Sequence, residues 1–377
     1  MKFIRLFSIN LFVLIFLLII IEVILWIFFP IYAPDPSVVK KFLQDIPGVK
    51  TEITYSRNDF GLRSLSMNGY TKPDNVIRIL CLGASTTDQV TQETRDTWCA
   101  LIETWLNRMY KDKNGISFQS VAFGRGGLRA IQNAQFAQVN TDNLNPDIVI
   151  TLLGINDLTW NGGSDYTYQS PKAVLNKKEL RASHFFKKFS QIRRRMKIAK
   201  RKYWIKIGRV VEWHSKNLPS LRERRQSAPY RATITRDPDP IDEFTESVNW
   251  IAEYFVDRGV PLILLGQPVL WNKDMTQQET EALWFSINTP EGPVRPSAEW
   301  LQNEIGKYND VQRRIVLAHH GKQIWYKDLN AVIPKTLDYF FDDCHYTDLG
   351  SVTVAKEVLP VVIEAVEAIR SRKTLAN

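Results

Sequence analysis

The sequence predicts an α/β fold with a mainly parallel central sheet. Apolar runs rich in β-branched residues alternate with segments whose apolar residues recur at helical spacing, and short connections join them. Such alternation favours a parallel sheet covered by helices on both faces. Glycines end three of the apolar runs, at Gly83, at residues 124–127 and at Gly154. Because ligands of open α/β sheets bind at the carboxyl ends of the strands, we expect the functional site at these three ends.

Each expected element has its own signal in the sequence. Gly83 stops the first strand, Thr97 is suited to cap the first helix, and Pro146 marks the break before the third strand. In chain order, the expected strands cover residues 76–82, 116–122, 147–153, 260–265 and 322–329, and the expected helices cover residues 97–109, 129–144, 241–256, 296–319 and 348–369.

The first thirty residues predict a membrane segment. Residues 9–29 are apolar except for Asn10 and Glu22, a length that crosses a bilayer core, and Lys2 and Arg5 precede them. No small-residue cleavage site follows, so an uncleaved signal anchor over residues 1–30 is the prediction, with a cleaved secretory signal as the alternative. Either one exports the remainder, so we expect a single-pass protein of the cell membrane with its catalytic domain outside the cytoplasm.

The remainder divides by composition. Residues 31–75 predict a stalk and an irregular lead-in, and residues 76–372 predict the main domain. A basic insertion of helical character interrupts that domain at about residues 160–235, and residues 172–225 alone hold nineteen Lys or Arg against three Glu. The insertion is interpreted as a solvated helical surface, as a contact for anionic lipid headgroups, or as a contact for an acidic polysaccharide.

Composition and motifs exclude several classes of function. The net charge of +9 lies largely in the insertion of an exported domain, which argues against nucleic acid as a partner. The three scattered cysteines form no CxxC pair, and no metal-ligand cluster is evident. The glycines at residues 124–127 lack the third glycine and the acidic residue of a dinucleotide site. No cofactor or metal is therefore expected.

Two residues stand out as candidates for nucleophilic chemistry. Ser85 lies directly between an expected strand and a helix, where a backbone N–H near a helix N-terminus favours an oxyanion, although Ser is also a common helix cap. A serine nucleophile needs a base, and His345 is the histidine with carboxylates nearby, at Asp342 and Asp343. A capping loop that happens to contain a histidine is the other interpretation.

Four short blocks in a fixed order resemble the SGNH (GDSL-type) hydrolase superfamily. They are Gly-Ala-Ser at residues 83–85, a glycine at Gly127, Gly-Ile-Asn-Asp at residues 154–157 and Asp-Asp-Cys-His at residues 342–345. Residues 58–63 also resemble the lead-in of many bacterial members. The resemblance implies a three-layer, flavodoxin-like fold and a serine esterase.

The same resemblance assigns roles to individual residues. Ser85 would attack an ester carbonyl, His345 would remove its proton, and Asp342 would hold the imidazole. The backbone N–H groups of Ser85 and Gly127 and the side-chain amide of Asn156 would form the oxyanion hole. These residues make up the expected catalytic site.

The sequence departs from the family pattern in two of the blocks. Ala84 stands where the family usually has Asp, so altered packing beside Ser85 is expected. The second block lacks its usual Asn, which leaves Gly126 as an alternative to Gly127. Asp343 likewise remains an alternative to Asp342.

The expected function is hydrolysis of an acyl ester through an acyl-serine intermediate, with an O-acetylated carbohydrate as one candidate substrate. Trp160, Trp271 and Tyr346 are suited either to stack on sugar rings or to pack internally. An O-acyltransferase of a cell-envelope polysaccharide would use the same site, and a catalytically silent module that binds a polyanion is the alternative from another class.

Overall fold

The computed structural model describes residues 16–17, 37–42, 47–58, 60–67, 69–110, 115–159, 213–235, 239–289 and 291–376. Most of the predicted anchor, Trp160 and residues 160–212 of the basic insertion lie outside these ranges. No helix that the structure describes is long and apolar enough to cross a membrane. The chain divides into two compact units, and the larger one, residues 37–58, 62–176 and 212–377, holds the sheet and all candidate site residues.

The core of this unit is a five-stranded sheet with the strand order β10-β7-β5-β3-β4, in which every pairing is parallel. In chain order these strands are β3 Val76–Gly83, β4 Ser117–Phe123, β5 Ile148–Leu152, β7 Leu262–Gly266 and β10 Ile324–Asp328. Numbered along the chain, this is the 2-1-3-4-5 order of flavodoxin-like folds. The predicted parallel α/β fold is confirmed, and each of the five predicted strands is present within about two residues.

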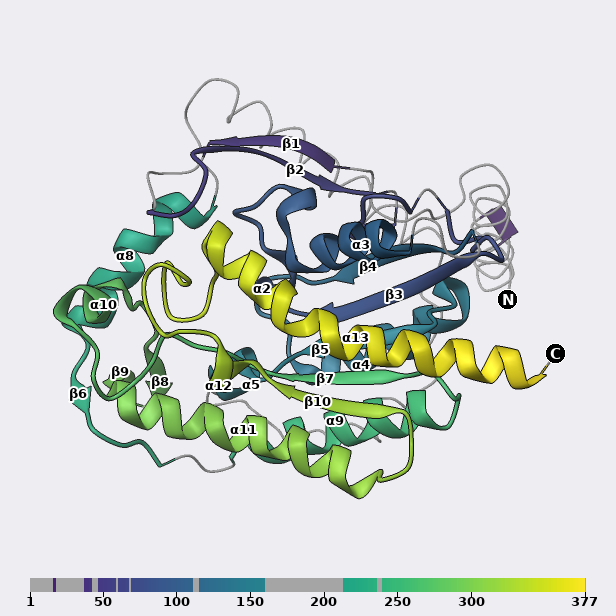
Figure 1. The fold of residues 1–377 in the computed structure, drawn as a ribbon. Helices are drawn as coiled ribbons and strands as arrows, with labels where there is room; N and C mark the ends of the chain where they lie inside the picture. The colour runs from purple at the N-terminus through teal and green to yellow at the C-terminus, as the bar shows by residue number, and fades with distance from the viewer. Residues whose placement is uncertain are drawn as a thin grey trace, which may run out of the picture. The chain divides into compact units, whose positions relative to one another are not determined.

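Helices cover both faces of the sheet, as the buried strands require. The main ones are α3 Trp98–Met109, α4 Ala130–Leu144, α9 Ile241–Val256, α11 Ala298–Ala318 and α13 Asp348–Ala376. Helix α13 packs on α3 in front of the strands (Figure 1), whereas α4, α9 and α11 pack against one another. Right-handed crossovers place the first pair on one face and the other three on the opposite face. The Thr97 hydroxyl caps α3 by accepting from Ala100 N, as predicted.

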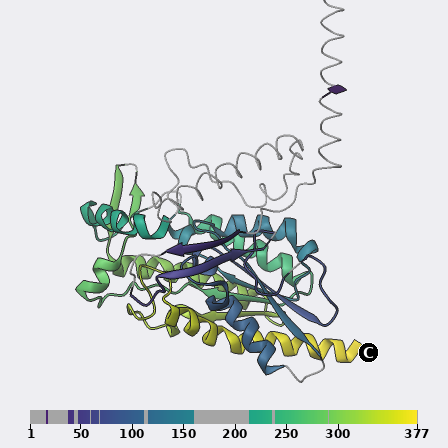
Figure 2. The ribbon, with the colours of Figure 1, turned by 90° about the horizontal axis from the view of Figure 1, so that it is seen from above.

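Shorter elements surround the carboxyl ends of the strands. Figures 1 and 2 both place α8, α10 and the β8–β9 hairpin beyond these ends, and the end of α13 on the opposite side. The elements are α2 Ser85–Asp88, the 3-10 turn Thr94–Asp96, α5 Ile155–Thr159, α8 Trp213–Ser227, β6 Tyr230–Arg231, α10 Gln277–Ala282, β8 Ile287–Thr289, β9 Gly292–Pro296 and α12 Leu329–Val332.

The segment predicted as a stalk and an irregular lead-in contains regular structure. Strands β1 Ser37–Phe42 and β2 Glu52–Arg57 pair as an antiparallel hairpin. Ile53 and Tyr55 of β2 are buried, whereas Thr54 between them is exposed. This alternation of buried and exposed side chains is short, and the polar residues around it mask its period of two in the sequence.

Candidate active site

Ser85 lies where the order of the strands reverses. It opens α2 directly after β3, and β3 is flanked by β4 on one side and β5 on the other. The residues that follow β5, Gly154 to Asn156, therefore lie beside the turn that carries Ser85. This position is the topological switch point at which doubly wound folds bind their ligands.

The turn that carries Ser85 is tightly packed against its surroundings. A Cβ added to Gly83 would lie 2.0 Å from Thr87 Oγ1, and one added to Gly124 would lie 2.6 Å from Asp88 N. Only glycine allows such a close approach of two backbone segments. The Ala84 carbonyl accepts from Asp88 N at 2.8 Å, which closes the single turn of α2. Ala84 itself is 2% exposed, so the position where the family usually has Asp is filled by a buried methyl group.

The lead-in residues hold this turn from the other side. Arg63, 2% exposed, donates to the main-chain oxygens of Asp88 and Gln89, and to that of Gln92 at 2.8 Å. Arg57 forms an ion pair with the Asp88 carboxylate at 2.6 Å. The loop after Ser85 thus receives buried cationic donors for its main-chain carbonyls. The resemblance of residues 58–63 to a family lead-in was the only sequence signal for this role.

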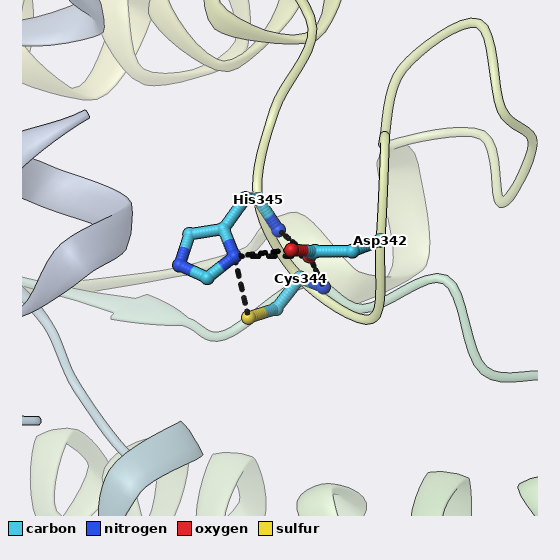
Figure 3. A group of neighbouring side chains, drawn as sticks. All are labelled: Asp342, Cys344 and His345. Carbon is cyan, nitrogen blue, oxygen red and sulfur yellow. Dashed lines mark hydrogen bonds and ion pairs between the residues drawn. The ribbon is translucent and has the colours of Figure 1, made fainter. Parts of the chain in front are cut away.

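Asp342 and His345 form a buried pair on the loop before α13. His345 Nδ1 lies 2.9 Å from Asp342 Oδ1 and 2.7 Å from Oδ2, and Figure 3 shows the carboxylate facing this ring nitrogen. Asp342 Oδ1 also accepts from the main-chain N–H groups of Cys344 and His345 at 3.0 and 2.9 Å. The carboxylate therefore fixes both the loop and the tautomer of the imidazole, with the proton on Nδ1 and the lone pair on Nε2.

The charges of this pair support each other. Burial alone raises the pKa of Asp342, but the charge of His345 and the hydrogen bonds outweigh it and hold that pKa below its usual range. Burial alone lowers the pKa of His345, but the Asp342 carboxylate outweighs it and raises that pKa well above its ordinary value. Stabilisation of the imidazolium is the property that a general base needs when it accepts a proton from serine.

Asp343, the alternative to Asp342, serves a different part of the structure. Its Oδ1 accepts from Trp271 Nε1 at 2.7 Å, and its Oδ2 accepts from the main-chain N–H groups of Trp284 and Phe285 at 2.7 and 3.2 Å. Burial, followed by the neighbouring charge of Asp342, raises the pKa of Asp343 to about 6. The geometry favours Asp342 as the residue that orients His345.

The predicted oxyanion donors border the same pocket as Ser85. Gly127 has a φ of +82°, in the left-handed region that favours glycine. Asn156 Nδ2 donates to Leu128 O at 2.9 Å, which ties the third sequence block to the glycine turn. This bond orients the side chain of Asn156, which also lines the pocket. Gly126 also lines the pocket, so position alone does not choose between the two glycines.

All five predicted site residues line one pocket, which has a volume of about 150 Å³. The pocket also has an apolar wall that the sequence did not predict. The apolar wall comes from α8 and from the loop before β8, which are distant from the motifs in sequence. It consists of Leu218, Leu221, Trp284 and Phe285, together with Ile155.

Two aromatic residues proposed as sugar platforms do not face the pocket. Trp271 is 0% exposed and Tyr346 is 2% exposed, so both pack internally. Burial favours internal packing, which is one of the two roles that the sequence allowed for them. Among the residues that the structure describes, Trp284 is the tryptophan that lines this pocket, and it is half-buried.

Asp342, Cys344 and His345 also form a group with metal-ligand atoms within 4.8 Å of one another. Cys344 Sγ lies 3.9 Å from His345 Nδ1 (Figure 3). Burial raises the pKa of the Cys344 thiol to about 11, and a thiol rather than a thiolate is a poor metal ligand. Since His345 Nδ1 already bonds to Asp342, the group is better suited to proton transfer than to holding a metal.

A family model and several solved structures are similar to this chain. Residues 79–358 match the family model described as GDSL-like Lipase/Acylhydrolase. No curated protein sequence matches the chain. Similar solved structures include the acetyl xylan esterase AlAXEase, with 13% identity, a TM-score of 0.42 and coverage of 76% of this chain and 100% of that chain. An acetylxylan esterase from Geobacillus stearothermophilus has 12% identity, a TM-score of 0.41 and coverage of 76% and 94%. TesA has 11% identity, a TM-score of 0.39 and coverage of 76% and 99%.

Proposed function

Because the chain belongs to the GDSL-like lipase/acylhydrolase family, and is thus an ester-hydrolysing serine hydrolase of the SGNH type, we propose that Ser85 is its nucleophile. The observation that carries the proposal is the buried Asp342–His345 pair, which borders the same pocket as Ser85. A nucleophilic serine requires such a base, oriented by a third group.

In the acylation half of the reaction, Ser85 Oγ attacks the ester carbonyl carbon and its proton passes to His345 Nε2. The carbonyl π bond becomes an oxyanion, and its charge is stabilised by the N–H groups of Ser85 and Gly127 and by the Asn156 amide. The tetrahedral intermediate then collapses. The bond to the alcohol oxygen breaks, and His345 returns its proton to the departing alcohol.

In the second half, water takes the place of the alcohol. His345 removes a proton from the water as its oxygen attacks the acyl carbon, and the same three donors stabilise the second oxyanion. Collapse breaks the bond to Ser85 Oγ, which regains the proton from His345. The products are the free acid and the starting enzyme. Asp342 remains ionised throughout and stabilises the imidazolium that forms in each half.

The pocket supports a short acyl group as the part of the substrate that enters it. A cavity of about 150 Å³ lined mainly by apolar side chains holds a ligand of roughly the size of benzene. Drug-sized ligands occupy pockets of about 300–1,000 Å³. We propose acetyl and other short acyl esters as the substrate class, and an O-acetylated carbohydrate as the natural form.

Membrane attachment is part of the same proposal. Residues 9–29 have the length and apolar character of a span, so we propose a single-pass enzyme with its catalytic domain outside the cytoplasm. The prediction is that the full chain stays in the membrane fraction after alkaline carbonate extraction. Release of the full chain into the soluble fraction would contradict the anchor.

The activity is tested on the full chain in detergent with a chromogenic acetate ester. We expect hydrolysis that falls at least about 1,000-fold in Ser85→Ala and in His345→Ala. Ser371→Ala is the matched control, since Ser371 is exposed near the end of α13. Unchanged hydrolysis in either variant would refute the assigned nucleophile or base. Acyl transfer to an added glycan without hydrolysis would instead identify an acyltransferase.

A further inference from the structure

Trp284 contacts the carboxylate of the candidate triad. It lies in the loop between α10 and β8, and its indole Nε1 donates to Asp342 Oδ2 at 3.0 Å. The same oxygen lies 2.7 Å from His345 Nδ1. One carboxylate oxygen therefore accepts from the base and from the indole at the same time. None of the family blocks contains this tryptophan.

The indole is held in position by the neighbouring aspartate. Asp343, which is 0% exposed, accepts from the main-chain N–H groups of Trp284 and Phe285. Asp343 also accepts from Trp271 Nε1, and Trp271 is fully buried. The two adjacent aspartates thus have separate roles, since Asp343 fixes the backbone of residues 284–285 and Asp342 receives the side chain.

The same indole forms part of the pocket wall. Trp284 lines the cavity together with Leu218 and Leu221 of α8. It packs against a buried cluster formed by Val49, Ile53, Leu218 and Phe341. Phe341 in turn stacks on the imidazole of His345, with an interplanar angle of 14°. An acyl group in the cavity would therefore contact the indole of Trp284, which is hydrogen-bonded directly to the Asp342 carboxylate.

We propose that Trp284 is a positioning residue for the Asp342–His345 pair and, through the same ring, the wall that sets the length of the acyl group. The proposal rests on the proposed function, because it assumes that this pair serves Ser85. An N–H donor locks the rotation of the carboxylate about its Cβ–Cγ bond, so that Oδ2 faces His345 Nδ1. A close-packed aromatic wall resists extra methylene groups in the cavity.

The donor also acts on the protonation of the base. The positive end of the indole N–H dipole lies near the imidazolium and competes for the same oxygen. Removing that donor leaves Asp342 a stronger acceptor, which favours the charged form of His345. We therefore expect loss of the N–H to move the titration of His345 to higher pH. A structural role alone would leave this titration unchanged.

The test separates the hydrogen bond from the wall. Trp284→Phe removes the N–H and keeps an aromatic ring, and Trp284→Ala removes the wall. Replacement of Trp284 by β-(3-benzothienyl)alanine removes the N–H and keeps the shape of the ring. This variant therefore keeps the test valid if Trp284→Phe or Trp284→Ala fails to fold. Phe285→Leu is the matched control, because Phe285 lines the same cavity and its side chain makes no hydrogen bond. The readouts are the NMR titration of the His345 imidazole and the rates with acetyl, butyryl and hexanoyl esters.

We expect the Phe and benzothienyl variants to raise the pH midpoint of His345 by at least about half a unit and to lower kcat roughly 10-fold, the effect of a lost hydrogen bond to a charged group. Phe285→Leu should leave the midpoint in place.

Trp284→Ala should increase the relative rate on hexanoyl over acetyl esters. An unchanged midpoint in the benzothienyl variant overturns the positioning role, and an unchanged acyl profile in Trp284→Ala overturns the wall. The NMR midpoint needs no turnover. An inactive wild type would therefore refute the proposed function, while the midpoint would still decide whether Trp284 acts on the Asp342–His345 pair.

Discussion

Gln92 links the loop after Ser85 to the loop of His345, because its side-chain amide donates to the main-chain oxygen of Tyr346 at 3.1 Å. The same amide donates to Thr347 O at 3.0 Å. Gln92 is 1% exposed, so its amide is shielded from water and hydrogen-bonds to the two carbonyls instead. The relative placement of Ser85 and His345 is therefore expected to depend on a side chain that belongs to none of the predicted site residues.

Gln92→Leu is expected to lower kcat about 10-fold on an acetate ester with a smaller change in KM. Leucine has a similar volume but removes the donor of Tyr346 O and one of the two donors of Thr347 O, which keeps its bond from Ser351 N. We therefore expect the His345 loop to relax away from Ser85. Steady-state kinetics and thermal unfolding are the measurements. Gln277→Leu, on the exposed face of α10, is the control. Equal kcat values in the two variants would show that the link is not needed for catalysis.

The pH profile follows from the raised pKa of His345. A general base works in its neutral form, so activity should be lost as the pH falls through the pKa of the folded enzyme. Because the Asp342 charge raises that pKa, the rising limb of kcat/KM should lie above pH 6.5, the ordinary value for histidine. A rising limb centred at or below pH 6.5 would contradict the inference that Asp342 stabilises the imidazolium of His345.

Asp342→Asn should move this limb in the opposite direction. Without the carboxylate charge, burial dominates and lowers the pKa of His345, so the limb shifts to lower pH while kcat falls at least roughly 100-fold. Asp310→Asn is the matched control, since Asp310 pairs with Arg313 and Arg314 on the surface of α11. It should leave both the limb and kcat in place. A shared shift in the two variants would point to a long-range charge effect.

Arg63→Met should destabilise the fold by about 2–5 kcal/mol, because several buried acceptors in the loop after Ser85 lose their donor at once. Urea unfolding monitored by far-UV circular dichroism gives the free energy of unfolding. Arg95→Met is the control, since its side chain is 69% exposed and its pair with Glu93 lies at the surface. Such a pair contributes about 0–1 kcal/mol. A loss at Arg63 no larger than at Arg95 would refute the anchoring role of the lead-in.

Gly127→Ala tests the choice between two glycines. At a φ of +82° a side chain costs roughly 1–2 kcal/mol, and the relaxing turn would pull its N–H away from the oxyanion. Removal of an oxyanion donor costs about 100–1,000-fold in kcat. No atom lies within 4 Å of the added Cβ at either glycine, so steric overlap is not the cause. Gly126→Ala should have a smaller effect, and the reverse order would assign the donor to Gly126.

The sequence predicted the sheet because its signals are local. Each strand is a short apolar run that stands out within its own few residues, and Thr97 or Gly83 marks an end by its own conformational preference. The blocks around Ser85, Asn156 and His345 were predictable for the same reason, since each one is contiguous. Their roles stay predictions that the kinetic tests above address.

What the sequence did not predict depends on contacts between distant segments. Leu218 of α8 and Trp284 of the loop before β8 reach one pocket only through the fold, and neither belongs to a motif. The choice between Asp342 and Asp343 depends on which carboxylate faces the imidazole, and two adjacent residues look alike in sequence. The sequence left both stacking and internal packing open for Trp271 and Tyr346, because burial depends on packing between distant segments, which a one-dimensional pattern does not encode.

The positions of Ser85 and His345 also have a consequence for the timing of activity. Ser85 follows the first strand of the central sheet, and His345 lies just before the last helix. Since synthesis proceeds at about 5–20 residues per second, Ser85 emerges tens of seconds before His345. The nascent chain therefore carries the proposed nucleophile without its proposed base for most of its synthesis. A product that ends before residue 345 lacks the proposed base, so we expect it to be catalytically silent.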